Sequence, residues 1–204
     1  LLDISNFIYK SSFSDVYIFN YLLNKDVKFI GKVKRLAICD SFKNNSKIDL
    51  SKVECEELSW NNPSNDCINN YTLPINLKIL DIKGRKTNLD SIPYNYLPNS
   101  LKNLRCEYTK ITKLPDNLPN SLEQIYFSSN EKLTSLDNVK FPDSLISISF
   151  TYGILTKLPD ILPINLQELI CYNNKLTSLD NVKFPNTLIE LHVDDNEIRY
   201  LPKL

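Results

Sequence analysis

The chain is poor in several residues that build common active sites. Among its 204 residues only three are Gly, one is His and none is Met. So few glycines exclude the usual phosphate-binding loops, which need Gly where the backbone approaches a phosphate. Lys plus Arg and Asp plus Glu are both 24, so the chain has no excess positive charge for nucleic acid. No apolar stretch has the length of a membrane span. We therefore expect neither nucleic acid nor membrane as a partner.

Paired cysteines are also lacking. The five cysteines form an odd set without a Cys-x-x-Cys pair, which argues against a disulfide framework and a zinc site. An intracellular, reducing compartment fits this usage best. Cys55, Cys106 and Cys171 fall where small apolar residues are required, so we expect them in the core. Cys39 and Cys67 are expected just after a strand and in a loop.

What the chain does have is a tandem repeat. The phrase Pro-x-(Ser/Asn/Thr)-Leu-x-x-(Leu/Ile) occurs six times with a period near 22 residues. The copies begin at Pro74, Pro98, Pro119, Pro142, Pro163 and Pro185. This period, with leucines three apart and an Asn a few positions on, is typical of a leucine-rich repeat.

Aligning the copies predicts the strands. Two fainter copies, centred on Leu36 and Leu58, precede the six at steps of 22 residues. We therefore expect about eight turns, with short parallel strands on the concave face. The central residues are Leu36, Leu58, Leu80, Leu104, Ile125, Ile148, Leu169 and Leu191.

Each turn has a physical interpretation. Alternate strand residues point inward, and an Asn after the strand can bond the backbone of neighbouring turns in a ladder. Asn130, Asn174 and Asn196 fit this position, while Thr109 and Gly153 are weaker substitutes. Frequent prolines predict an extended or 3₁₀ convex side. The fold class is thus an α/β-type solenoid of mainly β and irregular structure, whose stacked turns form the core.

Residues 1–32 depart from the repeat and form a separate segment before a solenoid over 33–204. They are densely apolar, and Ser14 with Asp15 suits a helix start, so we expect a helical N-terminal cap. A second hypothesis is the remnant of an F-box-like segment that recruits a ubiquitin-ligase scaffold, although the Leu-Pro opening of an F-box is missing. At the other end the repeat runs to Leu204, and we expect a C-terminal cap or further protein beyond it.

The phrase Leu-Pro-x-x-Leu-Pro-x-Ser-Leu-x-x-Leu carries a family resemblance. It spans Leu114 to Ile125 and, with Asn for Ser, Leu158 to Leu169. It resembles the leucine-rich and FNIP-type repeats of giant viruses of amoebae and of social amoebae, although the FNIP core is reduced to Lys-Phe-Pro at Phe141 and Phe184. It is also similar to the leucine-rich domains of secreted bacterial effectors. Some of those carry a Cys-x-Asp ubiquitin-ligase motif, which this chain lacks.

Catalytic and metal-binding patterns are weak. His192 is expected to face outward on the last strand, and Ser149, the one nucleophile in its column, lies two turns away. Asp194-Asp195-Asn196-Glu197 lacks the alternating ligands and the Gly of a calcium loop. We therefore predict no catalytic residue, cofactor or metal, and the alternative of a hydrolase or transferase would depend on His192.

The outward strand positions form columns along the concave face, which solenoids use for extended protein contacts. Aromatic and apolar residues among polar ones resemble binding anchors. We therefore predict a non-enzymatic module that binds a protein partner through this face. Two alternatives are a substrate-recognition subunit of a host ubiquitin ligase and a structural protein with no specific ligand. The predicted partner-binding residues are Arg105, Tyr126, Ile170, Tyr172 and His192.

Overall fold

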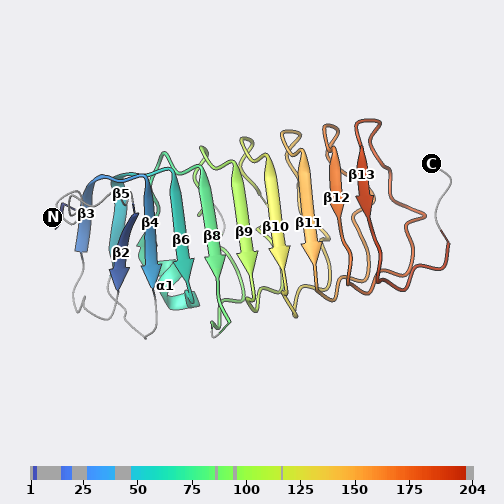
Figure 1. Ribbon diagram of the computed structural model, residues 1–204, viewed down its shortest axis with the longest axis horizontal. Helices are drawn as coiled ribbons and strands as arrows, with labels where there is room; N and C mark the ends of the chain where they lie inside the picture. Colours follow the sequence, from blue (N-terminus) through green and yellow to red (C-terminus); the bar gives the residue numbers. More distant parts are fainter. Residues whose placement is uncertain are drawn as a thin grey trace.

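The computed structural model describes residues 2–3, 15–19, 27–39, 47–85, 87–93, 96–115 and 117–200. Its main feature is a parallel sheet of nine strands that follow one another in chain order (Figure 1). The strands are β2 (Asp15–Phe19), β4 (Arg35–Cys39), β6 (Glu57–Asn61), β8 (Ile79–Lys83), β9 (Asn103–Glu107), β10 (Gln124–Ser128), β11 (Ser147–Thr151), β12 (Glu168–Ile170) and β13 (Glu190–His192). Such a row, one strand per turn, is a solenoid.

The predicted strand register is confirmed. The eight central residues from Leu36 to Leu191 are successive register partners across this sheet. From Leu36 to Leu169 they are at most 1% exposed, so they form one continuous row of the core. β2 adds a ninth strand, because Val16 pairs with Leu36.

Corresponding aromatic side chains also stack in the core. The rings of Phe127 and Phe150, on neighbouring strands, lie 5.5 Å apart.

The opposite side of the solenoid changes along the chain. In the N-terminal turns it is a second parallel sheet of β1 (Leu2–Asp3), β3 (Val27–Lys32), β5 (Ile48–Glu54) and β7 (Tyr71–Thr72). The later turns are extended there, as predicted, with isolated bridges between Asn117 and Lys140 and between Ile161 and Lys183.

The prediction missed a short helix, α1 (Asn65–Asn70), and placed Cys67, which belongs to it, in a loop. The cause lies in the local sequence: Ser64 precedes the helix, its carbonyl accepts from the Ile68 N–H, and Asp66 lies in the first turn. Cys39, expected just after a strand, is the last residue of β4.

The helical cap predicted for residues 1–32 is not confirmed. The described residues of this segment are β1, β2 and β3, and Asp15, expected at a helix start, opens a strand. A short, densely apolar run cannot be assigned to helix or strand from periodicity alone. Here pairing with β4 decides, because the five residues of β2 match those of β4 one for one. The remaining residues of the segment, Ser14 among them, lie outside the described part of the chain.

The repeated Pro phrase folds into the same turn each time. In all six copies the N–H of the phrase's Leu donates to the carbonyl of its Pro, three residues earlier. The third residue of the phrase then links turns. The hydroxyls of Ser121 and Ser144, for example, donate to the carbonyls of Leu101 and Leu122 in the preceding turn, at 2.6 and 2.7 Å. Thr187 and Asn165 make similar bonds, through a hydroxyl to the Leu166 carbonyl and through Nδ2 to the Asp143 carbonyl, so a side-chain donor at this position links adjacent turns.

The predicted Asn ladder is also present. Asn174 Nδ2 donates to the Phe150 carbonyl at 2.8 Å, and its Oδ1 accepts from the Leu155 N–H at 3.1 Å. Asn130 and Asn196 make the corresponding bonds to their preceding turns. Thr109 takes part through its hydroxyl, which donates to Asn130 Oδ1 at 2.6 Å. These bonds satisfy backbone groups that the strands leave unpaired in the interior.

Candidate functional site

The nine-stranded sheet has one face in the core and one toward solvent. In β10, Ile125 and Phe127 are 1% exposed, while Tyr126 between them is 37% exposed. We call the solvent side the open sheet face; it is the face that was expected to be concave. One row of it consists of successive register partners on β9 to β13, namely Arg105, Tyr126, Ser149, Ile170 and His192.

A hollow of about 360 Å³ lies in this face, and we call it the sheet hollow. It forms over β11, because Ser147 and Ser149 are small while Tyr126 and Ile170 on the flanking strands are large. Its lining consists of Arg105, Glu107, Gln124, Ile125, Tyr126, Ser147, Ser149, Glu168 and Ile170. Three of the five predicted partner-binding residues, Arg105, Tyr126 and Ile170, therefore meet at one place.

The polar groups of the sheet hollow are only partly satisfied. Ser147 Oγ donates to Glu168 Oε2 at 2.5 Å. Ser149 is 5% exposed, and its hydroxyl has no hydrogen-bond partner among the described residues. Arg105 likewise forms no ion pair within the described ranges. The hollow thus combines an aromatic wall, an aliphatic wall and polar groups with bonding capacity to spare.

The other two predicted residues lie beyond the hollow. Tyr172 contacts Tyr152 edge to face, with ring centroids 5.2 Å apart, and burial raises the pKa of the Tyr172 phenol. His192 is exposed beside Ile170 on the next strand, and its Nε2 lies 3.6 Å from Glu190 Oε2. Tyr172 and His192 thus extend the predicted binding surface toward β13 and do not line the sheet hollow.

Sequence reasoning missed two exposed tyrosines at the edge of this face. Tyr108 and Tyr152 each follow a strand and have φ angles of 56° and 52°, in the left-handed region. The Arg85 guanidinium lies 4.7 Å from the Tyr108 ring centre, and Tyr152 contacts Tyr172 as described. Both stand four residues after the central Leu or Ile of their turn. That spacing was the available signal, since residues at the same position in other turns also have positive φ.

Ser149 and His192 do not form a catalytic pair. Ser149 and His192 are separated by β12, and with strands about 4.8 Å apart their Cα atoms are roughly 10 Å from each other. No hydrogen bond therefore joins this nucleophile to this base.

The described thiols and acids offer no reactive cluster either. Cys55, Cys106 and Cys171 are buried and free, as predicted, and burial raises the pKa of each thiol to about 12. Asp195 Oδ2 accepts from Asn173 Nδ2 at 3.1 Å. Within the described residues, no three His, Cys, Asp or Glu side chains are grouped so as to hold a metal ion. Likewise, no helix in the described part is long and apolar enough to cross a membrane.

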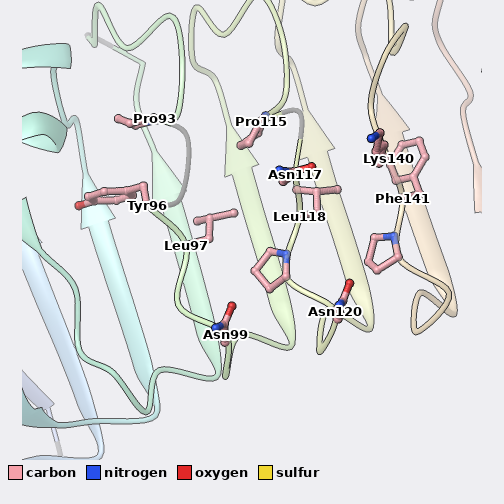
Figure 2. A pocket seen from close by; sticks show the side chains of 12 residues that line it. Pro93, Tyr96, Leu97, Asn99, Pro115, Asn117, Leu118, Asn120, Lys140 and Phe141 are labelled. Carbon is pink, nitrogen blue, oxygen red and sulfur yellow. The ribbon is translucent and has the colours of Figure 1, made fainter.

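A second hollow, of about 380 Å³, lies among the segments that connect the strands. Figure 2 shows its side chains on three successive turns, with Tyr96 and Leu97 before β9, Leu118 before β10 and Phe141 before β11. Its described lining is mostly Pro, Asn and apolar residues, with Lys140 as the one charged group. With neither an acid nor a second cation among these residues, this hollow offers less chemistry than the sheet hollow.

Comparison with known proteins agrees with the architecture. No protein-family model matches the chain, and no curated protein matches it significantly. Among solved structures, YopM from Yersinia enterocolitica WA-314 is similar over 86% of this chain and 34% of its own, with 28% sequence identity and a TM-score of 0.55. CroV588, described as a novel circular LRR protein structure, is similar over 82% and 29%, with 23% identity and a TM-score of 0.46.

The similarity to YopM supports the leucine-rich repeat fold that the sequence predicted. The chain spans about a third of the length of the YopM chain that it matches. The narrower resemblance to FNIP-type repeats of giant viruses and amoebae stays a prediction.

Proposed function

We propose that this chain is a non-enzymatic interaction module that binds a protein partner through the open sheet face. One observation carries the proposal: register-matched side chains run unbroken across β9 to β13 and enclose a hollow beside Tyr126. Proteins with this fold commonly bind other proteins and typically act as scaffolds without catalysis.

The dimensions of the face suit a protein partner. Nine strands spaced about 4.8 Å apart give a length of roughly 38 Å, and five residues, the length of every strand except β12 and β13, give a width of about 16 Å. The resulting area of roughly 600 Å² approaches the ~800 Å² that each partner contributes to a standard interface. Tyr126 and Tyr152, at 37% and 54% exposure, offer the aromatic surface that dominates binding energy in such contacts.

The test is a selection for binders, followed by substitution. A display library of protein fragments would be selected against the immobilised protein, and the affinity of each selected clone measured again on Tyr126→Ala/Tyr172→Ala. Because each aromatic anchor contributes about 1 to 2 kcal/mol, we expect the double variant to bind at least tenfold more weakly.

The matched control is Ile161→Ala/Ile164→Ala, which removes two exposed side chains, at 71% and 65% exposure, from a connecting segment. We expect this control to keep full affinity, and circular dichroism would show that both variants stay folded. Clones that bind the tyrosine variant as tightly as wild type would place the interface elsewhere and refute the proposal.

The alternatives gain no specific support. A hydrolase would need a partner for His192, and Ser149 lies beyond hydrogen-bond reach, so His192→Ala should change no activity of the purified protein. The ubiquitin-ligase hypothesis rests on residues 1–32, most of which lie outside the described residues. It stays a prediction, as does the intracellular compartment with which the three free, buried thiols agree.

A further inference from the structure

The open sheet face is unevenly charged, although the chain as a whole is neutral. The strands β10, β11, β12 and β13 contain no Lys or Arg, but they carry Glu168 and Glu190. Asp194 and Asp195 follow β13 after Val193. The basic residues of the face, Arg35, Lys83 and Arg105, lie on β4, β8 and β9. A partner that covers β10 to β13 therefore meets negative charge.

Two of these acids face each other without a cation between them. Glu168 and Glu190 are register partners on the neighbouring strands β12 and β13, where like charges destabilise a sheet. Glu168 accepts from Ser147, and Glu190 lies near His192. Neither has a Lys or Arg partner within the described ranges. A cation brought by a partner would remove this repulsion.

Ser149 gives an independent indication that a polar ligand group enters the sheet hollow. Its side chain is almost fully buried, at 5% exposure, yet its hydroxyl has no hydrogen-bond partner among the described residues. It lines the hollow between Tyr126 and Ile170. Its oxygen is not one of the fully buried, unpaired atoms of the described residues, so it is reachable from the hollow and can bond a donor that enters there.

We infer that the partner presents an extended segment with an arginine side chain that enters the sheet hollow. The inference rests on the proposed function and specifies the chemistry of the partner. The aliphatic stem of the arginine packs against Ile170, and its planar guanidinium stacks on Tyr126. The guanidinium has several N–H donors in a fixed planar arrangement. It can therefore donate to the Glu168 carboxylate and to the Ser149 hydroxyl at the same time. Arg105 lies on the other side of Tyr126, and its positive charge repels the incoming arginine toward β12.

A selection with random linear peptides tests this inference. We expect selected peptides to be enriched in Arg at one position, and Arg→Gln in a selected peptide to weaken binding about tenfold. The same peptide substitution should have little further effect on Glu168→Gln/Glu190→Gln, because the charges that recognise the arginine are gone. The matched control is Glu131→Gln, an exposed acid in a turn outside the face, which should leave the arginine preference unchanged.

Each outcome separates the inference from the proposed function. Two results would overturn the inference and leave the proposed function standing, provided that the selected peptides lose affinity on Tyr126→Ala. One is that these peptides show no enrichment of Arg, and the other is that they bind Glu168→Gln/Glu190→Gln as tightly as wild type. Equal enrichment of Lys and Arg would refute the stacking of a guanidinium on Tyr126. Binders indifferent to Tyr126→Ala, or no binders from either library, would overturn the proposed function and the inference with it.

Discussion

Replacing Asn174 by Ala tests whether the Asn ladder holds the C-terminal turns together. Asn174 is 4% exposed and bonds two backbone groups of the preceding turn, the Phe150 carbonyl and the Leu155 N–H. Because Ala has no side-chain amide, both of these backbone groups lose their hydrogen-bond partner in the variant. A buried backbone group left unsatisfied costs about 1 to 3 kcal/mol, so we expect the free energy of unfolding to fall by roughly 2 to 6 kcal/mol.

The assay uses the linear arrangement of the solenoid. Each turn contacts mainly its neighbours, so a weakened turn near β12 should unfold before the N-terminal turns do. The one Trp, Trp60, is fully buried in β6 and reports on the N-terminal turns. In Asn174→Ala, the transition in guanidinium followed by circular dichroism should therefore begin at lower denaturant than the Trp60 fluorescence change. Hydrogen exchange should show faster exchange of the Leu155 amide.

The matched control is Asn165→Ala, which removes one exposed bond, from Asn165 Nδ2 to the Asp143 carbonyl. We expect it to change the free energy of unfolding by about 0.5 kcal/mol or less. If Asn174→Ala is as stable as this control, and its two transitions coincide, the ladder contributes no net stability and the reasoning is refuted.

Three further predictions concern local geometry and titration. Gly153→Ala should lower the melting temperature, because a Cβ at Gly153 would lie 2.8 Å from Asn174 Oδ1; an unchanged or raised temperature would contradict this. Ser129→Gly should raise stability by roughly 0.5 to 1 kcal/mol in denaturant titrations, since Ser129 has a φ of 54°, and a loss of stability would contradict that explanation. Burial raises the pKa of Cys106 and Cys171 from 9.0 to about 12, so the unfolded chain loses these protons first. Stability should be complete below pH 9 and fall between pH 9 and 12 by about 1.4 kcal/mol per pH unit for each thiol. Denaturant titrations at pH 8 and pH 10 should show a smaller fall in the free energy of unfolding for Cys171→Ala than for wild type.

The core could be predicted from sequence because the repeat constrains it so tightly. A turn can bury its apolar face only against its neighbours, so Leu80 and Leu104 must occupy equivalent positions and the register follows from their spacing. The same reasoning located Asn174, since a buried amide at that position can satisfy backbone groups of the adjacent turn. Here one-dimensional spacing determines three-dimensional contacts.

Features that depend on contacts between different parts of a turn escaped prediction. β2 is a strand because it pairs with β4, and its own apolar residues suit a helix equally well. Every copy of the Pro phrase has Ser, Thr or Asn at the position of Ser144, yet the acceptor of the Ser144 hydroxyl in the preceding turn became evident only with the turn geometry. The sheet hollow depends on small Ser149 between two larger neighbours, a property of three adjacent strands together.

Tyr152 offers a way to separate binding from stability. A Tyr with φ of 52° is strained by about 1 to 2 kcal/mol, while its edge-to-face contact with Tyr172 returns about 0.5 to 1.5 kcal/mol. These terms nearly cancel, and folding alone therefore gives little reason for an aromatic residue at this position. Tyr152→Gly should keep the free energy of unfolding within about 1 kcal/mol of wild type.

Binding should respond differently to the same change. Tyr152 stands at the edge of the open sheet face beside Tyr172, so its loss should weaken selected binders about fivefold or more, as expected for an aromatic anchor. Tyr108→Gly is the matched comparison: it relieves the same backbone strain two turns away, next to Arg85, and should leave binding at β10 to β13 unchanged. Equal affinity of both variants and wild type in biolayer interferometry would exclude the tyrosine edge from the interface. A large loss of stability in Tyr152→Gly would instead mean that its ring is required for packing.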